Sequence, residues 1–528
     1  MLIVTPISPQ ERKPCLQFAS SCFGSPASLI LWKLSCFDRV IFKGYLSICR
    51  VDRFEGWVDY ELGIRRKEYL ERDGKRMSRR LVGWAKSMAK RRGRPFVYDR
   101  TVQGKDEWAS RQLRASPIRS GLIAILSTLE SCPTFALKPG KDRPQFYSTR
   151  IPQQVLYYYF LDPRLGLMHV RIQTWAPFTI QVYVNGHDYL ARQMARLGLP
   201  FEQRDNAFVQ LEDPIRAQKL ADKFAQLNWP SLLNAYATMI NPLLRDVLKR
   251  DGHYWVTDQA EFSTDILFKN KATLAGLFSK LLEFAWLTFS PTNVMGFLGR
   301  AMHGRFAGEV IKDVKTERDP GARIKHRMKG NWLKMYDKFG AILRIETVIN
   351  QPGESKVFRE CHRKDGTCYR AWRPMAKGVG NLHHYQTHAL ACNQRYLQAL
   401  TSVSDPTPAY RELAKLAESK QVHGRNSAGF NPARRDDLSL FAAILDGDHI
   451  AQGFRNKDLR HALKLPSTPE QARRTSAAVS RILKRLHVRG LVAKIPRTRR
   501  WRVTKSGRQL LSCVLRTYRK DWPDQNAA

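Results

Sequence analysis

The stretch PEQARRTSAAVSRILKRLHVRGLVAKIPRTRRWRVTKSGRQLL, residues 469–511, decides how the C-terminal part of the chain is interpreted. Apolar residues recur every four positions at Ala478, Ile482 and Leu486, which predicts a helix with one buried face. Gly490 is placed to end that helix. The segments LVAKIP and RWRVT follow as two short strands joined by a basic turn.

Two further helices are expected before this stretch, at 437–448 and 456–465. Helix, helix, longer helix and hairpin is the element order of the winged helix-turn-helix. The pattern R-G-L-V-x-K followed by W-x-V-T-x-x-G resembles that of many winged-helix regulators. We therefore expect residues 436–520 to form a winged-helix DNA-binding domain.

The basic side chains of this domain are the expected DNA contacts, because Arg and Ser reach base edges and Arg and Lys bind phosphates. On the long helix we expect these contacts from Arg473, Arg474, Ser476, Ser480 and Lys484. On the wing we expect them from Arg497, Arg499, Arg500 and Arg502.

The charge of the whole chain agrees with such a partner. The 528 residues include 89 Lys and Arg against 47 Asp and Glu, a formal net charge of +42. A surplus this large favours a polyanionic partner. The nine cysteines are scattered and lack metal-ligand spacing, and no apolar run reaches the ~20 residues of a membrane span. We expect a cytoplasmic protein that binds DNA, duplex or single-stranded, without a membrane and without a nucleotide triphosphate, since no Walker-type loop is present.

A second basic stretch lies near the N-terminus, in an expected helix with few acidic residues. It predicts phosphate contacts from Lys75, Arg76, Arg79, Arg80, Arg91 and Arg92. A solvated charged face is the alternative interpretation of the same residues, and RNA is an alternative partner for the basic N-terminal region.

The expected fold class is α+β with several domains. Strand and helix patterns alternate in the first half, and Pro, Gly, Ser and Asn gather after residue 400. The expected divisions are a poorly ordered N-terminus (1–30), a basic α/β domain (31–145), a three-stranded α+β domain (146–250), a central α+β domain (251–400), a linker (401–435) and the winged helix (436–520).

Four short motifs follow one another in the central domain: EFSTDILF (261–268), FLGR (297–300), LKMYDKFG (333–340) and ILRIETVIN (342–350). In this order they resemble the replication-initiation-factor family, the rolling-circle initiators and related conjugative relaxases of Gram-positive plasmids and integrative elements. The resemblance implies an HUH-like, ferredoxin-like endonuclease unit. It also implies a metal held by carboxylates and a tyrosine that attacks a DNA phosphate to form a 5′-phosphotyrosine.

The residues present offer that chemistry. Mg²⁺ or Mn²⁺ needs oxygen ligands, which Glu261, Asp265 and Glu346 could supply. Lys338 or Arg344 could stabilise the charge of the transition state. The candidate nucleophiles are Tyr336, Tyr385 and Tyr396. Tyr396 is preferred, because Tyr336 lies inside the expected Y-D-K strand, where a structural role is favoured.

Two alternatives stay open. Phe339-Gly340 is a natural tight turn, so MYDK and ILRIE could be neighbouring strands whose charged residues simply form ion pairs across a hairpin. In that case the chain is a winged-helix DNA-binding regulator without catalysis, or an RNA-binding protein.

Overall fold

The structure is a computed structural model. It describes residues 29–249, 252–300, 308–315, 322–363, 365–400, 415–422, 425–432, 434–466, 468–496 and 498–521. The fold is mixed α+β with a large mixed sheet, as the sequence predicts. The poorly ordered N-terminus expected at 1–30 lies almost wholly outside the described residues, as do 401–414 of the expected linker.

The chain divides into two compact units. Unit 1 comprises Met1–Lys33, Thr264–Thr347 and Ala389–Ala528, and unit 2 comprises Leu34–Ser263 and Val348–His388. These units do not coincide with the expected domains. The boundary expected at residue 145 falls at the first residue of β4, which pairs with β3 from Gln145↔Lys138 to Leu161↔Gly121. A continuous ladder of this length ties the two expected domains into one sheet.

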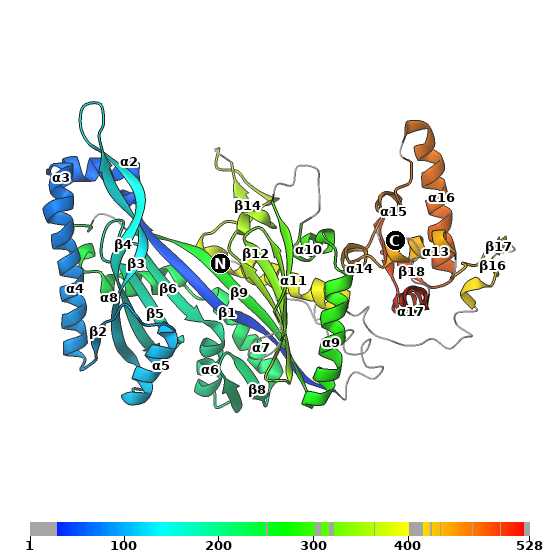
Figure 1. The fold of residues 1–528 in the computed structure, drawn as a ribbon, viewed down its shortest axis with the longest axis horizontal. Coiled ribbons are helices and arrows are strands. Elements are labelled where there is room, and N and C mark those ends of the chain that lie inside the picture. Colours follow the sequence, from blue (N-terminus) through cyan, green and yellow to red (C-terminus); the bar gives the residue numbers. More distant parts are fainter. Residues whose placement is uncertain are drawn as a thin grey trace. The chain divides into compact units, whose positions relative to one another are not determined.

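Unit 2 is built on seven strands in the order β9-β1-β6-β5-β4-β3-β2 (Figure 1). Most neighbours are antiparallel, whereas β2 runs parallel to β3. The strands are β1 (Ile30–Leu46), β2 (Phe96–Tyr98), β3 (Gly121–Lys138), β4 (Gln145–Asp162), β5 (Gly166–Gln173), β6 (Ile180–Asn185) and β9 (His253–Phe268).

The helices of unit 2 pack apolar faces inward, as α4 shows. Met77, Leu81, Ala85 and Met88 recur at helical spacing and are buried. The helices are α2 (Val51–Gly56), α3 (Arg66–Glu68), α4 (Gly74–Arg91), α5 (Lys105–Ala115), α6 (Gly186–Arg196), α7 (Pro214–Asp222) and α8 (Trp229–Ile240). Two hairpins complete the unit, β7 (Phe201–Arg204) with β8 (Ala207–Leu211) and β14 (Lys356–His362) with β15 (Cys368–Pro374).

Unit 1 contains strands in the order β10-β11-β12-β13-β9 and the helices that cover them. Its core joins residues from sheet and helices, including Leu281, Met335, Ile345 and Tyr396. The elements are β10 (Val310–Lys315), β11 (Arg323–Met328), β12 (Asn331–Lys338), β13 (Ile342–Ile349), α9 (Lys271–Thr288), α10 (Pro291–Phe297) and α11 (Leu382–Leu400).

The turn between β12 and β13 confirms the expectation from Phe339-Gly340. Phe339 has φ 59° and Gly340 has φ 72°. Two successive residues with positive φ match the twist of a two-residue hairpin turn. The MYDK and ILRIE segments therefore lie on consecutive strands.

The rest of unit 1 is a C-terminal module, residues 415–521, drawn in yellow to red in Figure 1. Its helices and strands follow the expected order, and one more short helix, α14, follows the first. They are β16 (Lys420–Val422), β17 (Arg425–Ser427), α13 (Arg435–Ile444), α14 (Gly447–Gln452), α15 (Asn456–Ala462), α16 (Pro469–Val488), β18 (Val492–Lys494), β19 (Trp501–Val503) and α17 (Lys505–Asp521). A β-bridge between Phe454 and Trp501 adds a third strand position beside the β18–β19 hairpin.

The glycines and threonine of the R-G-L-V and T-x-x-G patterns have structural roles in this module. Gly490 follows α16 with φ 68°, a conformation that favours glycine. Thr504 donates its hydroxyl to the Gly490 carbonyl and accepts from the Gly507 amide. A Cβ atom on Gly507 would lie 2.1 Å from the Leu491 carbonyl oxygen, so this position has no room for a side chain. The pattern therefore closes the hairpin against α17.

The linker expected at 401–435 is wrong for its described part. Leu416 and Phe430 are buried in the same core as Phe441 and Leu486. Arg485 donates to the carbonyls of Ala428 and Gly429, which fastens this segment to α16. The polar composition suggested a linker, but two apolar side chains are enough to anchor the segment to the module.

Candidate functional site

Helix α16 has one buried and one basic face. Val479, Leu483 and Leu486 are buried, while Ala478 and Ile482, which the sequence placed inside, are only half-buried. The exposed face carries four cations that form no ion pair with any described residue: Arg473, Arg474, Arg481 and Lys484. Residues 469–503 contain eleven Lys and Arg and a single acid, Glu470. The helix therefore presents uncompensated positive charge to solvent.

The two serines expected to contact DNA are engaged within the module. The Asn456 amide donates to the Ser480 hydroxyl at 2.9 Å and to the Ser476 carbonyl at 2.8 Å. These bonds hold α15 against α16. The structure thus places Ser476 and Ser480 at a helix–helix contact, although Ser480 also remains exposed.

The expected wing residues divide in a similar way. Arg499 and Arg502 are exposed, whereas Arg500 is half-buried and donates to the Gly453 carbonyl at 2.9 Å. Arg497 lies outside the described residues. The hairpin therefore offers at least two cations to a ligand and uses a third to hold its own geometry.

On helix α4 most of the expected phosphate contacts are exposed: Lys75, Arg76, Arg79, Arg91 and Arg92. Arg80 differs, because it pairs with Asp246 at 2.5 Å. Arg91 also lies over the ring of Trp84, 5.0 Å from its centroid. Helix α4 is a second basic surface, and Arg80 has a structural partner there.

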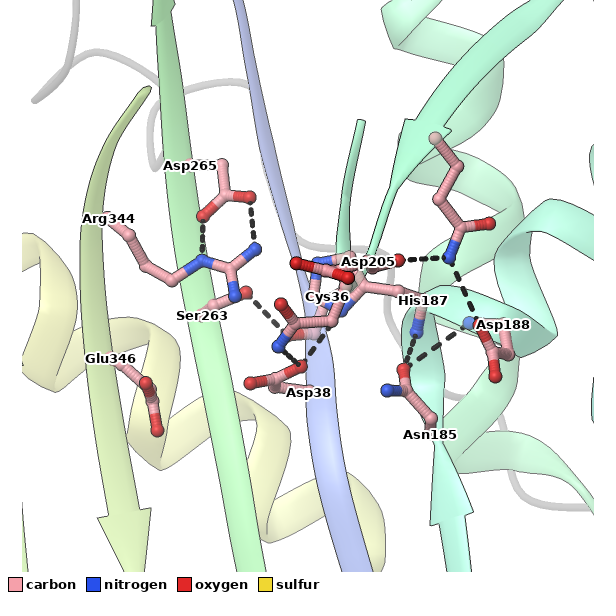
Figure 2. Close-up of polar contacts among 12 residues, drawn as sticks. Cys36, Asp38, Asn185, His187, Asp188, Asp205, Ser263, Asp265, Arg344 and Glu346 are labelled. Atoms are coloured by element: carbon pink, nitrogen blue, oxygen red, sulfur yellow. Dashed lines mark hydrogen bonds and ion pairs between the residues drawn. The ribbon is translucent and has the colours of Figure 1, made fainter. Parts of the chain in front are cut away.

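In the central motifs, Asp265 and Arg344 form a buried ion pair (Figure 2). Nε and Nη2 of Arg344 donate to the two carboxylate oxygens of Asp265 at 2.6 and 2.7 Å. Both side chains are almost fully inaccessible to solvent. With both oxygens accepting from the guanidinium, Asp265 does not fit the role of a metal ligand. Arg344 uses its Nε and Nη2 for the same pair.

Glu346 is bound by two residues of the neighbouring strand β12. Lys334 donates to one carboxylate oxygen at 2.7 Å and the Tyr336 hydroxyl donates to the other at 2.7 Å. The Lys334–Glu346 pair is an ion pair across the β12–β13 hairpin. It uses Lys334, which lies just before the MYDK segment that the sequence named for such pairs, and Arg344 pairs with β9 instead. The geometry also brings together one expected nucleophile, Tyr336, and one expected metal ligand.

Two more of the expected residues, Glu261 and Lys338, are largely buried. Glu261 belongs to unit 2, is largely buried and accepts from the Gln259 amide at 2.5 Å. Lys338 is largely buried beside the ring of Phe339.

Tyr396 is fully buried in the core of unit 1. Its hydroxyl lies 2.9 Å from Nε2 of His326. Burial raises the pKa of Tyr396 well above its usual value, and burial lowers the pKa of His326 to about 3. A neutral hydroxyl with a neutral partner and no solvent contact is poorly suited to attack DNA. Tyr336 is partly exposed and is better placed for attack than Tyr385 and Tyr396, which are both buried.

A polar centre that the sequence did not reveal lies in unit 2 (Figure 2). Sγ of Cys36 is 3.4 Å from Nε2 of His187, and Nδ1 of His187 is 3.2 Å from Asp38. Asn206 also donates to Asp38 at 2.6 Å. Cys36, Asp38 and His187 are buried, so this relay joins β1 to the start of α6. The residues are up to 170 positions apart, and no local pattern indicates that they meet.

The contact between α10 and α14 holds a titratable group with an unusual environment. Asn293 donates to Asp446 at 2.8 Å, and Asp448 lies beside them. Burial, together with the charge of Asp446, raises the pKa of Asp448 to about 7. The pKa of Asp448 is therefore higher in the folded protein than in the unfolded chain. The contribution of this carboxyl to stability is complete at low pH and is lost as the pH rises through about 7.

We therefore expect Asp448→Asn to raise stability above about pH 7, by about 1–3 kcal/mol, and to have little effect near about pH 4. Urea unfolding across this pH range measures the difference. Glu283→Gln, at an exposed position of α9, is the control and should change the stability at neither pH. A variant that is no more stable than the wild type at high pH would contradict the assignment.

The chain matches no protein-family model, no curated protein and no solved structure. Within the described part of the chain, no single helix is both long and apolar enough to cross a membrane. Helices α9 and α10 together reach that length and composition but are bent by 114°.

Proposed function

We propose that the chain is a DNA-binding protein whose C-terminal module is a winged helix. The order α13, α15, α16 and the β18–β19 hairpin, with the Phe454–Trp501 bridge, supports this fold. In such a module α16 enters the major groove and the β18–β19 hairpin contacts the backbone. The basic surface of α4 adds contacts to phosphates.

One observation carries the proposal: four cations on the exposed face of α16 have no acidic partner among the described residues. Like charges on one helix face repel one another, and a bound polyanion relieves that repulsion. A duplex supplies phosphates at close spacing, and neutralising them releases counterions. The salt dependence of duplex binding by the wild-type protein tests this electrostatic basis.

The affinity for a mixed-sequence duplex should fall with salt with a logarithmic slope of at least about −4, because each phosphate contact contributes about −0.9. Fluorescence anisotropy at several salt concentrations gives the slope. A flat response would reject the electrostatic basis of the proposal.

A second candidate activity is DNA nicking, favoured by the Tyr336–Glu346 hydrogen bond. In this reaction Glu346 accepts the phenolic proton while Oη of Tyr336 bonds to phosphorus. The bond from phosphorus to the 3′ oxygen breaks, and that oxygen takes a proton from solvent, which leaves a 5′-phosphotyrosine. Lys334 donates to the other carboxylate oxygen of Glu346 and holds that side chain in place. The sequence also predicts Mg²⁺ or Mn²⁺, and Glu261 and Glu346 are the expected carboxylate ligands that are not held by Arg344. No step of the reaction above depends on the metal ion.

We expect supercoiled plasmid to be nicked in the presence of Mn²⁺ or Mg²⁺, with protein attached to the 5′ end. Tyr336→Phe should abolish the adduct, whereas Tyr385→Phe and Tyr396→Phe, at fully buried positions, should retain it. Electrophoresis after protease treatment detects the linkage. Cleavage that survives in Tyr336→Phe would exclude this nucleophile, and a wild-type protein that never cleaves would favour a regulator without catalysis.

A further inference from the structure

The hairpin of β14 and β15 in unit 2 exposes two large aromatic side chains. Phe358 and Trp372 are direct partners across the two strands, and their ring centroids are 5.8 Å apart. Phe358 is 51% exposed and Trp372 is 65% exposed. Aromatic rings of this size normally bury most of their surface, so the pair indicates a binding surface.

Charged side chains flank the pair on the same face. Because side chains alternate along a strand, the two bases Lys356 and Arg370 share the face of Phe358 and Trp372, and both are exposed. One exposed acid, Glu360, lies on this face opposite Arg370. Residues 356–374 contain six Lys and Arg against two acids. The surface thus joins flat apolar rings to positive charge.

We propose that this hairpin binds single-stranded DNA, with bases stacked on Phe358 and Trp372 and phosphates on Lys356 and Arg370. Bases of a duplex are stacked on one another, so only unpaired bases offer their faces to protein rings. The proposal deepens the DNA-binding function but uses a surface separate from α16. The hairpin is labelled at β14 in Figure 1.

The test measures binding of fluorescent oligo(dT) and of a mixed-sequence duplex by the full chain. Trp372→Ala should weaken oligo(dT) binding about 5- to 150-fold, the equivalent of one lost stacking contact. Trp372→Phe should retain most of the affinity, because a ring remains. Tyr60→Ala removes an aromatic ring that is 80% exposed elsewhere in unit 2 and should have no effect. Duplex affinity should stay unchanged in all three variants.

Several outcomes would overturn the proposal. These are an unchanged oligo(dT) affinity in Trp372→Ala, an equal loss in Tyr60→Ala, or a much tighter affinity for oligo(rU) than for oligo(dT), which would make RNA the ligand. A change in oligomeric state without a change in DNA affinity would assign the rings to a second copy of the chain. A flat salt response in duplex binding would reject the α16 proposal and leave the hairpin proposal untouched. The two proposals can therefore fail separately.

Discussion

Replacing Arg473, Arg474, Arg481 and Lys484 by alanine together is expected to lower duplex affinity about 1000-fold at about 0.1 M salt. Each lost phosphate contact removes about 0.9 from the slope of affinity against salt, so the slope should shrink by about 3.6. The four side chains are exposed on one helix face, and alanine favours helix formation. The fold of α16 should therefore persist. Anisotropy titrations of the variant and the wild type at several salt concentrations measure both quantities.

A control for the loss of positive charge comes from unit 1 itself. Lys269 and Lys280 are exposed and lie outside the C-terminal module, so the double alanine variant removes positive charge without touching α16. Its slope should match that of the wild type. If the control loses as much affinity per charge as the α16 variant, the binding reflects the total charge of the chain and α16 has no special role.

Arg344→Met is expected to destabilise the protein by about 3–5 kcal/mol, because it leaves the carboxylate of Asp265 buried without its partner. Both groups are inaccessible to solvent, so water cannot replace the lost hydrogen bonds. Urea unfolding followed by tryptophan fluorescence measures the change. The effect should be present without DNA, which separates it from any role in binding.

The matched comparison is the pair between Arg434 and Asp436, which is largely exposed at 2.9 Å. Arg434→Met should cost less than about 1 kcal/mol, since exposed ion pairs contribute little. Arg344→Met combined with Asp265→Leu should recover much of the stability, because no charge then stays buried alone. A small effect of Arg344→Met would show that Asp265 has another source of compensation.

Local patterns in the sequence predicted most elements of the fold. Apolar spacing indicated α16, and strand and helix patterns indicated an α+β first half. The Phe339-Gly340 turn was predictable because few residue pairs adopt two positive φ values in succession. All of these features depend on neighbours within a few positions along the chain.

Site chemistry was less predictable, because it depends on which distant groups meet. Asp265 was a plausible metal ligand until its partnership with Arg344, 79 positions away, was seen. Tyr396 follows a helical pattern that does not reveal its depth, and its contact with His326 lies 70 positions away. Ser480 was expected at DNA but accepts a hydrogen bond from Asn456.

The sequence by itself determined the net charge, the helix and strand periods and the amphipathic form of α16, since these follow from residue type and short-range geometry. Only the tertiary structure decided which charges are neutralised. It pairs Arg344, Arg80 and Lys334 with acids and leaves Arg473, Arg474, Arg481 and Lys484 without acidic partners among the described residues. The reason is that a charge acts through its distance to other charges and through its burial, and both are set by folding.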